Sequence, residues 1–297
     1  MSNTSSRKDQ AASKGASSKT RERAKTSETR NRDRHLPADG PPHPPSGMAV
    51  TRLIATLSLR RARRSRLIRV AMAVLALPVL AAIAGVAAGR NGAAFFETIL
   101  ELFLRYLAPL VLALFSSQSV AEEVQGRTIT YLWSRPIARW ALPVGKYLGT
   151  LAITGTLLTL SLVACYLVAM IPAGGSLFSE LPLLALGWVS LMTGALYFAA
   201  LASAFGAMVT SFPFAIMLIY VLAIDVAMGF VPGILKVIAM TVHLRAIAGL
   251  YKPQTGMFSS DPALNATISL PVVLVMTSLW LILAVAIAST SEYRSTR

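Results

Sequence analysis

Six long apolar runs alternate with polar segments along the chain, at about 67–89, 94–117, 147–171, 183–209, 212–232 and 268–289. A helix needs about 20 mostly apolar residues to cross the hydrocarbon core of a bilayer, and each run is long enough. The spans must be helical, because an open backbone in lipid leaves its amide groups without hydrogen-bond partners. The pattern therefore predicts an all-α, polytopic membrane protein built as a bundle of six transmembrane helices.

The polar N-terminal segment is predicted to be a disordered basic cytoplasmic tail over residues 1–47, followed by a six-helix transmembrane domain over 48–297. The tail's Ser, Lys, Arg and Pro residues cannot bury enough apolar surface to fold. Five arginines in "LSLRRARRSR" (57–66) lie directly before the first span. They place that end of the span in the cytoplasm, against anionic lipid headgroups.

Composition supports a membrane protein: 55% of the residues are hydrophobic, 14% are charged and the mean hydropathy is +0.60. The net charge of +15 is mostly local, since 16 of the 28 Lys and Arg residues lie in positions 1–66. Such a bias is a signal of orientation, and no nucleic-acid partner is expected. Six crossings then place both termini in the cytoplasm of a multi-pass protein of the cell (inner) membrane, with membrane lipids as partners.

One loop departs from this charge rule. The 233–267 loop falls outside the cell, yet it contains Lys236, Arg245 and Lys252. Its stretch "GILKVIAMTVHLRAIAGLY" (233–251) is apolar enough to lie along the interface or to dip back into the membrane.

A polar strip, "AEEVQGRTITYLWSRPIARWALPVGKY" (121–147), separates the second and third spans. Its apolar residues recur at helical spacing up to Leu132, which predicts a short amphipathic helix. Pro136 turns the chain before a second short element, "IARWAL", which is expected to end near Pro143. The strip is thus either a compact cytoplasmic knob or an ordinary interfacial loop whose arginines anchor the topology.

The order of residues in this strip resembles the permease family of ABC-2 type transporters. The matching positions are Glu122, Glu123, Gly126, Thr128, Leu132, Ser134, Arg135, Pro136, Arg139, Gly145 and Lys146, and the six-span layout is also similar. The resemblance implies a permease, with export as the favoured direction, paired with a second copy or a paralogue. It also implies a separate ABC-type ATP-binding subunit that uses the ATP, so no cofactor is expected to bind this chain directly.

In that family the loop between the second and third helices couples the permease to the ATP-binding subunit. The resemblance therefore assigns this role to ten residues here: Glu122, Glu123, Gly126, Arg127, Thr128, Leu132, Ser134, Arg135, Pro136 and Arg139. The Gly145-Lys146 pair lacks the preceding glycine of a phosphate-binding loop, so a nucleotide site of that kind is not expected.

Charged residues inside the spans are the remaining candidates. Glu97, Glu101 and Arg105 recur every four residues, so Arg105 can pair with Glu101 one turn earlier. The pair is either part of a translocation path or a structural ion pair, since unpaired charge is costly in a membrane. Asp225 is the lone acid of its span and is either a relay group or the acceptor of an interhelical hydrogen bond.

Other classes of protein are less compatible with the sequence. A membrane-embedded enzyme would need clustered catalytic groups, and an ion-coupled secondary carrier would need ion ligands near the midplane. The three histidines are scattered and Cys165 lies in an apolar run, so neither catalytic residues nor a metal site are predicted. The transported substrate and the choice between homodimer and heterodimer stay open.

Overall fold

The computed structural model describes residues 46–115, 138–173, 177–209, 211–231, 233–253, 255–256 and 259–290. The chain divides into two units, Met1–Pro44 and Pro45–Arg297, and every described residue belongs to the second. Nearly all of the predicted tail, and the predicted coupling residues from Glu122 to Pro136, therefore lie outside the described residues.

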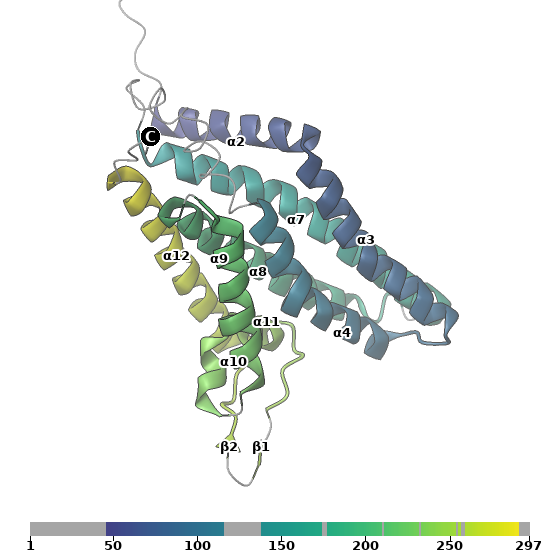
Figure 1. Cartoon of the computed structure of the whole chain (residues 1–297). Helices are drawn as coiled ribbons and strands as arrows, with labels where there is room; N and C mark the ends of the chain where they lie inside the picture. Colours follow the sequence, from purple (N-terminus) through teal and green to yellow (C-terminus); the bar gives the residue numbers. More distant parts are fainter. Residues whose placement is uncertain are drawn as a thin grey trace, which may run out of the picture. The chain divides into compact units, whose positions relative to one another are not determined.

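The described residues are almost entirely helical (Figure 1). Apart from the helical residues 108–115, the elements in chain order are α2 (Gly47–Arg64), α3 (Arg66–Ala87), α4 (Ala93–Leu102), the π-helix η1 (Phe103–Leu107), α7 (Ala141–Met170), η2 (Ile171–Ala173), α8 (Leu181–Met208), α9 (Pro213–Tyr220), the π-helix η3 (Val221–Val226), α10 (Ala227–Phe230), η4 (Ile234–Ile238), α11 (Met240–Ile247), β1 (Thr255–Gly256), β2 (Ser259–Ser260) and α12 (Ala266–Thr290). The two strands form one short antiparallel pair.

Six helices in the described ranges are long and apolar enough to cross a membrane, which confirms the predicted fold class. They are Arg66–Ala87, Ala93–Phe115, Ala141–Met170, Leu181–Met208, Pro213–Phe230 and Ala266–Thr290. The third begins earlier than predicted, and the expected break near Pro143 is wrong. Pro143 is the third residue of α7, and the first four N–H groups of a helix have no intrahelical partner, so its missing N–H costs nothing there.

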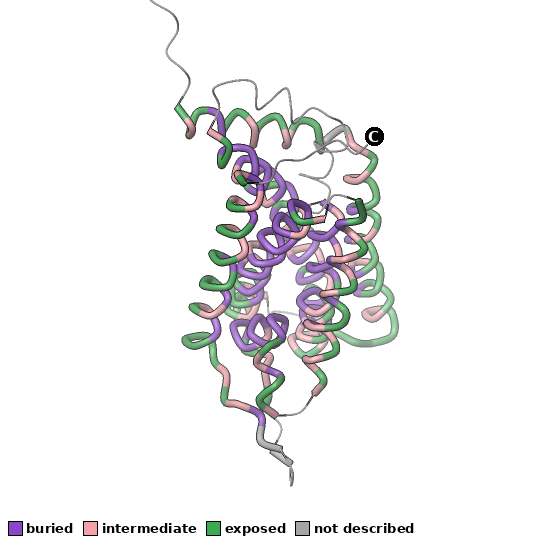
Figure 2. The backbone as a smooth tube through the Cα atoms, turned by 60° about the vertical axis from the view of Figure 1, so that its left-hand side comes forward, coloured by how far each residue is buried: buried purple, intermediate pink, exposed green. Residues whose placement is uncertain are grey.

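Helix α8 carries much of the core. Its stretch from Ser190 to Ala204 is almost continuously buried, and Ala199, Ala200, Ala202 and Ala204 are fully enclosed. Such small side chains let neighbouring helices approach closely, and α8 packs extensively along α12. Figure 2 shows the buried positions gathered on the inward faces of the helices, with exposed positions on their outer faces. Outward-facing apolar residues are expected of a protein whose solvent is lipid.

Helix α2 packs along α7 through two glycines. A Cβ at Gly145 would lie 2.8 Å from Ile54 Cβ and 2.9 Å from the Thr51 carbonyl oxygen. At Gly149 it would lie 2.8 Å from Ser58 Cβ and 2.9 Å from the Ala55 carbonyl oxygen. The spacing of four residues places both glycines on one face of α7, so the backbone of α2 can come into direct contact with it.

The pair Gly85 and Gly89 shows the same spacing but does not act as one packing surface. Gly85 faces the ring of Phe95, whereas Gly89 adopts a φ of 81° just beyond the end of α3. The Arg90 N–H donates to the Gly85 carbonyl at 2.9 Å and the Gly89 N–H donates to Val86 at 2.9 Å. This is the hydrogen-bond pattern of a left-handed helix stop, for which glycine is favoured.

The 233–267 loop folds back onto the bundle. Most residues of α11 are buried, and the helix packs against α8 and α12. A Cβ at Gly194 of α8 would lie 2.7 Å from Leu244 Cδ1, so this contact also depends on a glycine. The segment that the sequence predicts to lie along the interface or to dip back into the membrane is thus packed against α8 and α12.

Candidate functional site

The described end of the polar strip runs directly into α7. The Ala141 N–H donates to the Ala138 carbonyl at 2.9 Å, so helical bonding begins within the strip, whose last residues already belong to α7. Arg139 Nη1 donates to the Ser289 carbonyl oxygen at 3.1 Å, in the last turn of α12. A cation near the C-terminal carbonyls of a helix is favourably placed. Arg139 thus joins the strip to α12 as well as to α7.

Two π-helical segments interrupt the second and fifth spans. In η1 the Ala108 N–H bonds to the Phe103 carbonyl, five residues earlier, and in η3 the Ala227 N–H reaches back to Leu222 in the same way. Pro109 gives a local cause for η1, because it lacks the N–H that would bond the Arg105 carbonyl in an α-helix. Segments of this kind occur often at functional sites.

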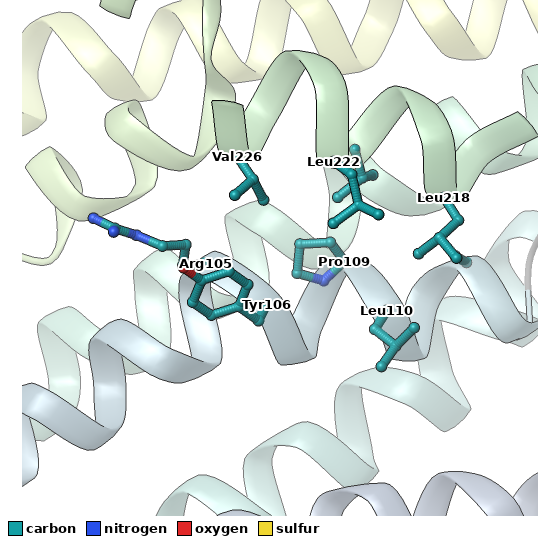
Figure 3. Close-up of a pocket in the computed structure, with 9 residues that line it drawn as sticks. Arg105, Tyr106, Pro109, Leu110, Leu218, Leu222 and Val226 are labelled. Carbon is teal, nitrogen blue, oxygen red and sulfur yellow. The ribbon is translucent and has the colours of Figure 1, made fainter. Parts of the chain in front are cut away.

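A pocket of about 190 Å³ lies between these two spans. Its lining residues are Arg105, Tyr106, Pro109, Leu110, Ala113, Leu218, Val221, Leu222 and Val226. Figure 3 shows Arg105 at one end, with its guanidinium directed away from the apolar side chains, while Leu110 and Leu218 stand at the other end. The pocket is therefore an apolar space bordered by a charge at one end.

That charged end contains three ionised side chains. Arg105 Nη2 donates to Glu101 Oε1 at 2.9 Å, and Arg245 Nη2 lies 2.9 Å from the same oxygen in an ion pair. The Arg105 guanidinium also lies over the ring of Phe230, with its carbon 4.8 Å from the ring centroid, in a cation–π contact. Burial lowers the pKa of Arg245, and the Glu101 carboxylate opposes that shift. Since guanidinium groups stay protonated in proteins, the group has one more positive charge than negative.

Asp225 joins the fifth span to α11. Its Oδ1 accepts a hydrogen bond from the Met240 N–H at 2.7 Å, and its main-chain oxygen accepts one from Thr241 Oγ1 at 2.9 Å. Ala239 precedes α11 and has no side chain that can cap it, so Asp225 supplies the acceptor from another element. Its Oδ2 is buried and has no hydrogen-bond partner within the described part of the chain. Asp225 therefore accepts an interhelical hydrogen bond, which is one of the two roles that the sequence left open for it.

Other polar residues of the returned loop are also paired inside the protein. Lys236 Nζ lies 2.6 Å from Asp261 Oδ2, and Asp261 Oδ1 accepts from the Gly233 N–H at 3.0 Å. His243 Nε2 lies 3.0 Å from the Val237 carbonyl oxygen, and Nδ1 lies 3.2 Å from Ser269 Oγ. A neutral ring satisfies both contacts by donating from Nε2 and accepting at Nδ1. Two of the loop's three bases, Lys236 and Arg245, are thus matched by carboxylates.

This arrangement of six apolar spans, a helix-packed core and a loop folded back onto the spans defines a polytopic membrane protein with an apolar pocket between its second and fifth spans. Comparison with protein families identifies which kind. Residues 59–227 match the model described as "ABC-2 family transporter protein", from the end of α2 to just beyond η3, and the chain belongs to this family. No curated protein matches the chain. Family membership makes it a transporter membrane domain whose partner is an ATP-binding subunit.

The structure brings some predicted site residues together and separates others. Glu101 and Arg105 lie at one end of the pocket, whereas Asp225 turns toward α11. Arg139 lies at the entry to α7, and the predicted coupling residues before it fall outside the described ranges. Arg245 was not predicted as a partner of Glu101, although its position in an amphipathic loop with three basic residues was a signal for an ion pair.

Proposed function

We propose that this chain is the membrane-spanning subunit of an ATP-driven exporter in the cell membrane. Two such permeases, identical or paralogous, would work with two separate ATP-binding subunits. Membership of the ABC-2 family supports a permease role and an ATP-binding partner. The choice of export, the pairing of two permeases and the cytoplasmic placement of both termini are part of the proposal.

The observation that carries the proposal is the mechanical continuity from the strip into the bundle. The strip's last residues lead without a break into α7, a 30-residue helix. Close contact at Gly145 and Gly149 joins α7 to α2, and the Arg139 hydrogen bond joins the same region to α12. A displacement applied to the strip would therefore act on three helices at once.

Such a connection suits a transporter driven from outside the bundle. Closure of the ATP-binding subunits on the strip would move α2, α7 and α12 as a rigid body, which shifts the balance between inward-facing and outward-facing states. The ATP-binding partner supplies the energy. The permease makes different contacts in the inward-facing and outward-facing states, and this difference determines how far the equilibrium between them shifts.

The charges of the 233–267 loop bear on the proposed orientation. External loops usually contain few Lys or Arg residues, and this loop contains three. Lys236 pairs with Asp261 and Arg245 pairs with Glu101, which lowers the cost of holding these bases against the bundle. The loop remains a departure from the positive-inside pattern, and the proposed orientation rests on the arginines that precede the first span.

Copurification tests the proposal. The tagged full chain is extracted in mild detergent, the proteins that accompany it are identified by mass spectrometry, and ATP hydrolysis is measured on the eluate. We expect an ABC-type ATP-binding subunit and ATPase activity, both lost when residues 121–139 are scrambled. Scrambling residues 1–44 is the matched control and should leave both intact. A correctly inserted chain that purifies alone and inactive would refute the proposal.

A further inference from the structure

We propose that the pocket between the second and fifth spans binds the hydrocarbon chain of an anionic amphiphile, whose headgroup lies at the Arg105 and Arg245 end. This inference rests on the proposed transport function and names the chemical class of its cargo. It is carried by the pocket's lining, by the charge at its end and by the two π-helical walls.

The pocket favours hydrocarbon over water. Seven of its nine lining residues are aliphatic, and a buried water needs two to four polar partners, which such walls do not offer. Its volume of about 190 Å³ is below the 300–1,000 Å³ that is typical of sites for whole drug-sized ligands. The space therefore fits a segment of an alkyl chain better than a compact polar molecule.

The charge next to the pocket favours an anion. Two guanidinium groups share one carboxylate oxygen, so the group of Glu101, Arg105 and Arg245 has an excess positive charge. Arg245 Nε is buried and has no hydrogen-bond acceptor among the residues that the structure describes. The excess positive charge of the group is costly within a membrane protein, and an arriving carboxylate or phosphate would reduce that cost. The shared chemistry is a single anionic headgroup.

Access to the pocket comes from its outer rim. Tyr106 is 41% exposed and Leu222 is 51% exposed, and both belong to π-helical segments. The π geometry widens each helix by one residue per turn at this level, so the two irregular segments meet at the same pocket. A lipid hydrocarbon chain in the surrounding bilayer can thus enter the pocket laterally, between the second and fifth spans.

A second copy of the permease is the alternative occupant of this rim, and the charge argues against it. A two-fold contact presents the same patch from both copies, so each copy would bring its own excess positive charge to the interface. Like charges facing each other in a medium of low dielectric constant repel strongly. An anionic ligand removes this repulsion, whereas a second copy adds to it.

Fluorescence titration of the purified full chain in mild detergent, without an ATP-binding subunit, tests the proposal. The probe is 11-(dansylamino)undecanoic acid, and its uncharged methyl ester is the reference. We expect the acid to bind about tenfold more tightly than the ester, as a charge-assisted hydrogen bond provides. Equal affinity for acid and ester would overturn the assignment of the headgroup to the two arginines.

Variants separate the roles of charge and pocket. Arg245→Gln should reduce the acid's affinity to that of the ester, while Glu101→Gln should increase the preference for the acid. Leu222→Trp should abolish binding of both probes by filling the pocket, and Ile219→Trp, on the same span, outside the pocket lining and 65% exposed, should leave binding unchanged. Unaltered binding in Leu222→Trp would overturn the proposed site.

The second-copy alternative has its own readout. A Leu222→Cys chain that forms a disulfide-linked dimer in full yield and binds no probe would show that the rim is an interface, which overturns the proposal. The titration needs no ATP-binding subunit, so failure to bind the probe would leave the copurification result standing. Loss of copurification would likewise leave probe binding standing, which keeps the two hypotheses distinguishable.

Discussion

Glu101 holds two guanidinium groups with one oxygen, so its removal should be more harmful than removal of either arginine. Glu101→Gln leaves two like charges side by side, whereas Arg245→Gln leaves the neutral pair of Glu101 and Arg105. We expect Glu101→Gln to reduce stability by about 1–2 kcal/mol more than Arg245→Gln, since all three side chains are partly exposed. Thermal unfolding of both variants in the same detergent measures the difference, and the reverse order would contradict it.

His243 should make stability depend on pH. Burial lowers its pKa below the usual value of 6.5, so the unfolded chain binds a proton more readily than the folded one. The stability contributed by the neutral ring is complete above pH 6.5 and declines as the pH falls from there toward the folded pKa. The slope is at most about 1.4 kcal/mol per pH unit.

The measurement is thermal unfolding between pH 5 and 8, compared with His243→Gln. The variant removes the titrating ring, so its stability should fall less than that of the wild type on acidification. Parallel pH profiles for the two proteins would show that His243 contributes nothing to the dependence.

The contact between α2 and α7 leads us to expect opposite effects on stability when two glycines of α7 are replaced by alanine. Gly149→Ala places a Cβ 2.8 Å from Ser58 Cβ and should destabilise the protein by about 1–3 kcal/mol through overpacking. Gly155→Ala meets only Met192 Sδ, at 3.6 Å, and should be neutral or stabilising by up to about 1 kcal/mol, because alanine is the better helix former.

Thermal stability in detergent checks this pair of substitutions, and a disulfide between Cys residues introduced in α2 and α7 reports on the contact itself. If both glycines tolerate alanine equally, the glycine face of α7 is not what holds α2.

The helical spans could be predicted from the sequence because lipid requires every backbone amide to be paired within its own segment. Hydropathy therefore located all six. It could not locate η1 and η3, since a shift of the hydrogen bond by one residue leaves the apolar pattern almost unchanged. Pro109 offered a signal for η1, whereas the sequence of η3 offers none that we recognise.

The candidate site could be predicted only where partners lie on one helix. Spacing of four residues placed Arg105 beside Glu101, and the structure has them 2.9 Å apart. Spacing says nothing about partners from distant segments, so Arg245 beside Glu101 and Met240 beside Asp225 required the fold. The contact of Gly145 and Gly149 with α2 likewise required the fold, because a spacing of four residues does not say which helix a pair of glycines will contact.

At the scale of the whole molecule, point changes in the strip should separate coupling of ATP hydrolysis to transport from insertion of the protein into the membrane. Glu122→Ala and Arg135→Ala should insert normally yet uncouple hydrolysis from transport, because the strip would no longer pass movement on to α7. Transport and ATPase rates in proteoliposomes measure the coupling ratio, with Lys252→Ala in the 233–267 loop as a control. Coupling equal to the wild type in both variants would contradict the assigned role.

The glycine contact between α2 and α7 also has a consequence for biosynthesis. Ile54 and Gly145 are separated by about 90 residues of chain, and synthesis at about 5–20 residues per second leaves α2 waiting roughly 5–20 s for its partner. During that interval its arginines and the exposed Leu53 and Leu57 suit the surface of the membrane. We therefore expect assembly in two stages, in which α2 rests on the bilayer and transfers to α7 once the third span has been inserted.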